Sequence, residues 1–272
     1  MTKYKIKLHS QGRVPLINIK ELLNYKELLW TFVERNLKVR YKQTVIGGFW
    51  AILQPFMTMV VFSFFFGKIA KIPSDGVPYP LFSYSGLILW TYFSNALTLG
   101  MGSMLGSANL ISKVYFPRII IPVSATLTGI LDYLVAFSIV FGLLLFYHHP
   151  LNWQFILFPV ILVFTWLLAT GISFWTSAIN VKYRDMYHVL PFFIQLFVFI
   201  TPVIYPTSVA GQFKWLVTLN PMTGLIETHR ALILGQPINL ILLCLSILMT
   251  IVILFTGLIY FKSVERQFAD II

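Results

Sequence analysis

Residues 119–147 read IIIPVSATLTGILDYLVAFSIVFGLLLFY, an apolar run with a single charged side chain, Asp132. A helix of about 20 apolar residues crosses the hydrocarbon core of a bilayer, which is roughly 30 Å thick. A helix also satisfies its own backbone hydrogen bonds where no water is available. The alternating segments that make a membrane β-barrel are absent from the sequence. We therefore predict a transmembrane helix here.

The rest of the chain has the same character. Of its 272 residues, 58% are hydrophobic and 11% are charged, with a mean hydropathy of +0.81, whereas soluble domains carry about 25% charged residues. We predict an all-α membrane protein in which residues 47–262 form one transmembrane domain, between an N-terminal segment, 1–46, and a short tail, 263–272. The six predicted transmembrane helices are 47–67, 82–106, 119–147, 153–179, 189–206 and 238–261.

The basic residues lie mainly on one side of this predicted bundle. Sixteen of the 20 Lys and Arg residues fall in 1–46, in the loops 107–118 and 182–184, or after residue 261. Because cytoplasmic loops are enriched in Lys and Arg, we expect a multi-pass protein of the cytoplasmic (inner) membrane with both termini in the cytoplasm. The net charge of +11 follows from this bias and does not indicate nucleic-acid binding. The basic residues expected outside are Lys68, Lys71, Lys214 and Arg230.

The segment before the first span has the pattern of an amphipathic helix. Apolar residues recur at helical spacing from Tyr25 to Tyr41. Such a helix is suited to the cytoplasmic headgroup layer, with its basic face toward anionic lipid; packing on a soluble partner is the alternative. Gly47 and Gly48 then let the chain turn into the first span. The predicted apolar face is Tyr25, Leu28, Leu29, Phe32, Val33, Leu37 and Tyr41, with Lys26, Glu34, Arg35, Lys38 and Lys42 on the other side.

Sequence motifs of enzymes are missing. The chain has no HExxH, no GxSxG and no cluster of carboxylates or histidines at metal-ligand spacing, so we expect no catalytic residue and no metal site. Asp132 is the only acid well inside a span. A charge at that depth makes a functional role the first hypothesis, but one carboxylate without a basic partner in another span makes a poor proton relay. We expect a structural role for it, bonded to a neighbouring helix.

The outer loop 207–237 contains a further helix. Asn220 has the position of an N-cap, Pro221 opens the first turn and Gly235 ends the helix. At about 14 residues it is too short to span a bilayer, so we expect it to lie at the outer surface or to re-enter the membrane there. The sequence TPVIYP, residues 201–206, should break the fifth span just before this loop.

Five stretches in register with the six spans resemble a known family. Together they are similar to the permease subunit of type-2 ABC exporters, specifically the group that moves O-antigen, capsule or teichoic-acid polysaccharides. The resemblance covers roughly residues 30–236. The stretches are RNLKVRYKQTVIGGFWAILQP at 35–55, LISKVYFPRIIIP at 110–122, INVKYRDMYHVLPFFIQ at 179–195, TPVIYP at 201–206 and LNPMTGLIETHRALILG at 219–235.

This resemblance implies a homodimer in which each protomer pairs with a separate ATP-binding subunit, two copies in all. The chain has no GxxxxGK[ST] phosphate-binding loop, so ATP and Mg²⁺ are expected on that subunit and no cofactor on this chain. The elbow, residues 107–118, is then expected to be the coupling helix. Its expected ATPase contacts are Leu110, Ile111, Val114, Tyr115 and Phe116, with Lys113 and Arg118 at the headgroup level.

The family lines its channel with the first and fifth spans, and in this chain each carries a stripe of apolar residues with one glutamine. Sugar rings present C–H faces that stack on aromatic side chains, which suits the expected cargo, a lipid-linked polysaccharide. Without the resemblance, such stripes are more typical of lipid-facing or core positions. The candidate channel residues are Trp50, Gln54, Met57, Val61 and Phe65 in the first span and Phe192, Gln195 and Phe199 in the fifth.

Two other functions stay open at the level of sequence. One is export of drugs or lipids by a member of the same superfamily, although the elbow motif YFPR and the loop motif KYRD favour the polysaccharide group. The other is a membrane-embedded transferase acting on a lipid-linked sugar. That reaction needs acidic or histidine residues converging at a membrane face, and only Asp185, beside Arg184, is placed for it.

Overall fold

The computed structural model describes residues 24–42, 47–150 and 152–268. These residues form helices and their connections, with no β-strand among them, which confirms the all-α prediction. The elements are α2 Lys26–Tyr41, η1 Gly47–Phe49, α3 Trp50–Phe62, η2 Ser63–Ile69, α4 Tyr79–Gly106, α5 Ala108–Ile111, α6 Ile120–Phe146, η3 Trp153–Leu157, α7 Phe158–Lys182, α8 Met186–Ile200, η4 Thr207–Phe213, α9 Lys214–Thr218, α10 Pro221–Leu234, α11 Leu240–Val264 and η5 Glu265–Gln267.

Four segments of the described chain are long and apolar enough to cross a membrane. They correspond to four of the six predicted spans, and they confirm the chain as a membrane protein by length and composition. The two other predicted spans are α4 and α8, and each departs from a simple apolar span in its own way. The four segments are Gly47–Ile69, Ile120–Phe146, Trp153–Lys182 and Leu240–Val264.

The helix α4 has the length of a span, 28 residues, but it is not apolar throughout. It lies at the centre of the protein, packed against α3, α6, α7 and α10, and 17 of its residues are buried. Because other helices rather than lipid surround it, it can bury the hydroxyls of Ser83 and Ser85, which donate to carbonyl groups one turn back. The low hydropathy of this span thus reflects its central position.

The helix α8 is shorter than the predicted span 189–206. It contains 15 residues and ends at Ile200, which corresponds to about 22 Å of helix. Residues 201–206 leave the helical path, as TPVIYP predicts, since proline removes a backbone donor and clashes with the preceding turn. The helix alone is therefore shorter than a full crossing.

The helices α7 and α11 pack with their backbones in close approach. A Cβ atom at Gly257 would lie 2.3 Å from the carbonyl oxygen of Gly171, and one at Gly171 would lie 2.7 Å from the Cα of Leu254. Small residues at such crossings allow close van der Waals packing between helices in a membrane. This contact fixes α11 against α7 and so against the centre of the bundle.

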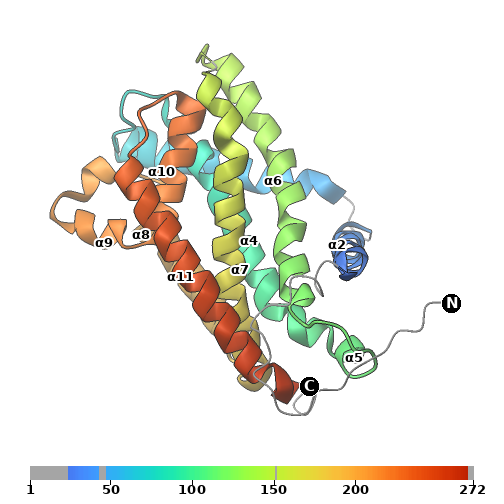
Figure 1. Cartoon of the computed structure of the whole chain (residues 1–272). Helices are drawn as coiled ribbons and strands as arrows, with labels where there is room; N and C mark the ends of the chain where they lie inside the picture. The colour runs from blue at the N-terminus through green and yellow to red at the C-terminus, as the bar shows by residue number, and fades with distance from the viewer. Residues whose placement is uncertain (1–23, 43–46, 151, 269–272) are drawn as a thin grey trace.

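Figure 1 shows which connections share an end of the bundle. The elbow with α5 and the C-terminal end of α11 lie at one end, and the turn between α6 and η3 lies at the opposite end. The helix α2 is seen end-on beside α6, whereas α6 and α11 are seen from the side, so α2 runs across the bundle. This is the arrangement expected if the elbow and the C-terminus share one side of a membrane and α2 lies along its surface.

Single-cysteine labelling tests the sidedness of these ends. The native residues Asp75, Gln212, Lys113 and Arg184 are all exposed, so a reagent can reach each position. After replacement of the exposed Cys244, we expect a membrane-impermeant maleimide to label positions 75 and 212 from outside and positions 113 and 184 only from inside. Labelling of position 113 from outside would reverse the topology.

Candidate functional site

The elbow presents a small surface at one end of the bundle. The single helical turn α5 is followed by a non-helical stretch before α6. Val114 and Tyr115 are 57% and 85% exposed. Leu110 and Lys113 are exposed as well. These four residues are the members of the predicted contact set that a partner could touch.

Two other predicted contact residues, Ile111 and Phe116, are buried, with 7% and 5% exposure. Phe116 packs against Phe32 of α2 with ring centroids 5.7 Å apart, in a small core that α2, the elbow and the end of α11 share. At this turn both side chains face the interior of the protein, so within the protomer neither offers a surface to a partner. They anchor the elbow from inside.

Arg118 is bonded to the residue that follows the C-terminal end of α11. Its guanidinium donates to the backbone carbonyl of Glu265, and its backbone N–H donates to Oε1 of the same residue at 3.3 Å. Lys262 forms a 2.7 Å ion pair with Glu265. The elbow is therefore held by α2 on one side and by the C-terminal end of α11 on the other, so a force on its exposed residues reaches both helices.

Both predicted channel stripes lie on the surface of the protomer. Their aromatic members, on α3, η2 and α8, are between 54% and 59% exposed, and the glutamines are exposed too. Core positions are thereby excluded, which leaves the lipid-facing and the channel-lining alternatives. The exposed set comprises Trp50, Gln54, Met57, Val61, Phe65, Phe192, Gln195 and Phe199.

The first stripe does not follow one regular line. Residues Ser63–Ile69, η2, form a π-helix, in which each turn holds more residues than an α-helical turn does. Phe65 is therefore rotated away from the line that α-helical spacing predicts through Trp50, Met57 and Val61. Single-turn π-helices occur frequently at functional sites, and this one lies at the far end of the first predicted span from α2.

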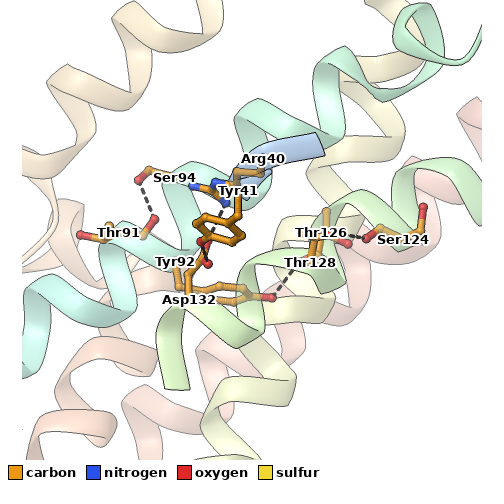
Figure 2. Close-up of polar contacts among 9 residues, drawn as sticks. All are labelled: Arg40, Tyr41, Thr91, Tyr92, Ser94, Ser124, Thr126, Thr128 and Asp132. Atoms are coloured by element: carbon orange, nitrogen blue, oxygen red, sulfur yellow. Dashed lines mark hydrogen bonds and ion pairs between the residues drawn. The ribbon is translucent and has the colours of Figure 1, made fainter. Parts of the chain in front are cut away.

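Asp132, the lone acid of the span 119–147, is bonded to the end of α2 (Figure 2). The guanidinium of Arg40 lies 2.5 Å from its Oδ2, and the hydroxyl of Tyr41 donates to its Oδ1. Burial and the hydrogen bond to Asp132 raise the pKa of Tyr41 to about 12, so this hydroxyl keeps its proton. The expected bond to a neighbouring helix is present, and that helix is α2.

A cavity of about 370 Å³ lies beside this contact, between α2, α3, α4 and α6. Trp50 and Gln54 of the first stripe line it together with Asn95 of α4 and the Arg40–Asp132 pair. The part of the first stripe nearest to α2 thus borders a cavity with polar groups. The position of Gly47 at its edge, with φ of 55°, fits the predicted turn into the first span.

The sequence left open whether α10 lies at the surface or re-enters the membrane, and its burial excludes an exposed surface helix. Its predicted ends are confirmed: the Asn220 side chain accepts from the backbone of Met222 at 3.0 Å, and Gly235 has φ of 63°. However, 12 of its 14 residues are buried, because it packs against α4, α7 and α11. It is therefore a helix of the protein interior at the end of the bundle opposite the elbow (Figure 1).

Two polar residues connect α10 to the rest of this interior. His229 lies 2.6 Å from the hydroxyl of Tyr133 on α6 and 2.9 Å from the carbonyl of Ser85 on α4. The guanidinium of Arg230 donates to the backbone carbonyls of Phe82, Pro202 and Val203 at 3.0–3.3 Å. Arg230 also lies over the Phe82 ring, 3.7 Å from its centroid. It joins α10 to α4 and to the break that follows α8.

Residues 27–234 match the family described as ABC-2 type transporter. The match runs from α2 to the end of α10, and so includes the elbow, α8 and the interior helix. This chain belongs to the ABC-2 type transporter family. The resemblance read from the five sequence stretches is thereby confirmed at the level of the family.

Relatives of this ABC-2 transporter chain are similar over nearly its full length. The O-antigen export system permease protein RfbA of Myxococcus xanthus is 28% identical over 93% of this chain and 98% of that protein. A protein of the same name from Klebsiella pneumoniae is 27% identical over 90% and 95%. The polysialic acid transport protein KpsM of Escherichia coli is 24% identical over 85% and 91%.

Sequence reasoning missed the polar contacts that hold this ABC-2 transporter chain together. The positive-inside count places Arg230 among the outer charges, yet it is 3% exposed. The available signal was the run ETHR, residues 227–230, in which His229 and Arg230 stand within a mainly apolar helix. The partner of Asp132 was also missed, although Arg40 and Tyr41 stand at the end of the helix that leads into the first span.

Proposed function

We propose that this chain is the channel-forming permease subunit of an ATP-driven ABC exporter whose cargo is a lipid-linked polysaccharide of the O-antigen type. The observation that carries the proposal is the similarity, over 93% of this chain, to a permease named for O-antigen export. The exposed elbow offers a surface to an ATPase, and the exposed stripes offer aromatic surfaces to sugar. Export of drugs or lipids has less support, since these relatives are named for polysaccharides.

The transporter that we propose is a homodimer with two ATP-binding subunits in the inner membrane, with both termini in the cytoplasm. Six crossings per protomer result if α4, and α8 with its continuation 201–206, span together with the four apolar segments. The helix α2 then lies in the headgroup layer. A second copy of the chain would enclose the stripes that one protomer leaves exposed. ATP and Mg²⁺ bind the partner subunit, while this chain supplies no catalytic residue.

Co-expression tests this function. The permease is produced with an ATP-binding subunit encoded in the same operon, the complex is purified, and ATP hydrolysis and glycan export are measured. We expect a complex with two copies of each chain, and we expect surface glycan to disappear when the permease gene is deleted. A permease that binds no ATP-binding subunit, or whose deletion leaves surface glycan unchanged, would contradict the proposal.

Tyr115→Ala in the elbow is expected to weaken binding of the ATP-binding subunit. Tyr115 is 85% exposed at the centre of the elbow surface, and truncation of an interface aromatic commonly costs about 2 kcal/mol, roughly thirtyfold in affinity. The measurement is the dissociation constant between permease and ATP-binding subunit in detergent. Trp153→Ala, a 73% exposed aromatic at the opposite end, is the control and should bind normally.

Phe116→Ala should behave differently from Tyr115→Ala because its side chain is buried against Phe32. We expect it to lower the melting temperature of the permease by more than Tyr115→Ala does, because Tyr115 is 85% exposed. If Tyr115→Ala binds the ATP-binding subunit with normal affinity and export continues, the elbow is a structural turn and the coupling surface lies elsewhere.

A further inference from the structure

A second cavity, of about 840 Å³, lies between α2, α4 and α6 close to the elbow. We call it the α2 groove. It shares Arg40 and Asn95 with the smaller cavity that Trp50 and Gln54 line, so it leads toward the first channel stripe. Its polar lining includes Arg35, Asn95, Thr98, Ser103, Ser107 and Tyr187.

The α2 groove contains a cation without a carboxylate partner. The positive charge of Arg40 is matched by Asp132, but no ion pair joins Arg35 to a carboxylate within the described residues. The guanidinium of Arg35 instead lies 3.3 Å from the hydroxyl of Ser107 and over the ring of Phe32 at 4.7 Å. Partial burial in the groove removes some of the water around the guanidinium and so lowers the pKa of Arg35. An anion bound in the groove would neutralise the charge of Arg35 and replace part of its lost hydration.

Neutral donors lie in the same groove. The side chains of Asn95 and Tyr187 line it, and neither forms a hydrogen bond to another described residue. Gly102 allows the hydroxyl of Tyr187 to lie close to α4, because a Cβ at Gly102 would be 3.1 Å from that oxygen. The groove therefore combines one unmatched guanidinium with amide and hydroxyl groups, the chemistry that binds a phosphate and an adjacent polyol.

We propose that the α2 groove binds the phosphate and the first sugar of the lipid-linked glycan, with Arg35 on the phosphate and Asn95 and Tyr187 on the sugar. The proposal rests on the proposed function. The groove lies beside α2, at the level where the phosphate of a membrane lipid would be found if α2 occupies the headgroup layer. An ordinary phospholipid offers the same phosphate without the sugar, so the test must separate these two sources.

Protection of a cysteine in the groove provides this test. Thr98, which is exposed in the groove, is changed to cysteine in a Cys244→Ser background, and the complex with its ATP-binding subunit is placed in phosphatidylcholine nanodiscs. We expect geranylgeranyl diphosphoglucose to slow maleimide labelling several-fold, and geranylgeraniol, which lacks the phosphates and the sugar, to have no effect. Phosphatidylglycerol at the same mole fraction should protect far less. No protection by the diphosphoglucose, or equal protection by phosphatidylglycerol, overturns the proposal.

Variants of Arg35 test whether its charge contributes to binding of the diphosphoglucose. Arg35→Gln should raise the concentration of diphosphoglucose needed for protection about tenfold, the value of one charge-assisted hydrogen bond, and Arg35→Lys should recover part of it. Lys38→Gln is the control on the same helix, since Lys38 pairs with Glu34 at the surface. Equal affinities of Arg35→Gln and wild type would remove Arg35 from the site.

Filling the groove gives a variant with little risk to folding. A Cβ at Gly106 meets no atom within 4 Å, so Gly106→Leu should occupy the groove, abolish protection and leave the melting temperature unchanged. Gly142→Leu, also into open space, is the control. Glycan export by the wild type in cells is measured in parallel: a complex that exports glycan without protection at position 98 overturns only the groove, whereas absence of export overturns the proposed function.

Discussion

An Arg230→Ala variant is expected to be destabilised by about 3–5 kcal/mol, because three buried carbonyl groups lose their hydrogen-bond donor. The side chain is 3% exposed, and its removal leaves the carbonyls of Phe82, Pro202 and Val203 without their donor. Each buried acceptor that loses its partner costs about 1–3 kcal/mol. Thermal unfolding of the purified permease should show a fall in melting temperature on the order of 10 °C.

Arg230→Ala should also affect export, because Arg230 holds the non-helical segment that follows α8. Arg230 is one of three side chains that tie α10 to residues 201–207; Asn220 donates to the hydroxyl of Thr201 at 2.7 Å, and Glu227 accepts from the backbone of Thr207 at 3.3 Å. Loss of Arg230 should therefore free the end of α8, which carries the second predicted channel stripe. We expect export to fall further than the amount of folded protein does.

Two further variants make the Arg230 prediction specific. Arg230→Lys keeps the charge but loses the planar fork that reaches several carbonyls, so we expect an intermediate melting temperature. Lys214→Ala removes an exposed cation from the neighbouring α9 and should have no effect. A normal melting temperature for Arg230→Ala would show that the three carbonyls find other donors and that α10 is held by its apolar contacts alone.

The apolar spans and the residues at which helices begin and end were predictable from sequence, because interactions between residues close in the chain determine them. Asn220, Pro221 and Gly235 bound α10 as expected, since an N-cap, a first-turn proline and a left-handed glycine act within a few residues. The break at 201–206 follows from its prolines in the same way. Such features need no knowledge of what the helix packs against.

The side chains that face inward at a turn could not be predicted in this way. By hydropathy, Ile111, Phe116 and Tyr115 are equally suited to contact a partner. Only the packing of α2 and α11 against the elbow buries Ile111 and Phe116 and leaves Tyr115 exposed. The burial of α10 has the same origin. Its apolar stripe fits a membrane surface as well as a protein core, until α4, α7 and α11 are placed around it.

Complete loss of export is expected when bulky groups are attached at positions 54 and 195, one in each channel stripe. A path for a long polymer should hold each sugar ring weakly, because a strong site would stall the chain. Loss of one aromatic, as in Trp50→Ala or Phe199→Ala, should therefore reduce export only several-fold at unchanged protein level. A bulky adduct narrows the path instead, and no other contact can compensate for a blocked passage.

The measurement uses Gln54→Cys and Gln195→Cys in a Cys244→Ser background, treated with a membrane-permeant thiol reagent before glycan export is assayed. Both native glutamines are exposed in the protomer, so the reagent should reach them. Leu248→Cys on α11 is the matched control, because Leu248 is 58% exposed and lies outside both stripes. If positions 54 and 195 react fully while export continues, both stripes face lipid, and the channel must then be formed by other exposed surfaces of the protomer.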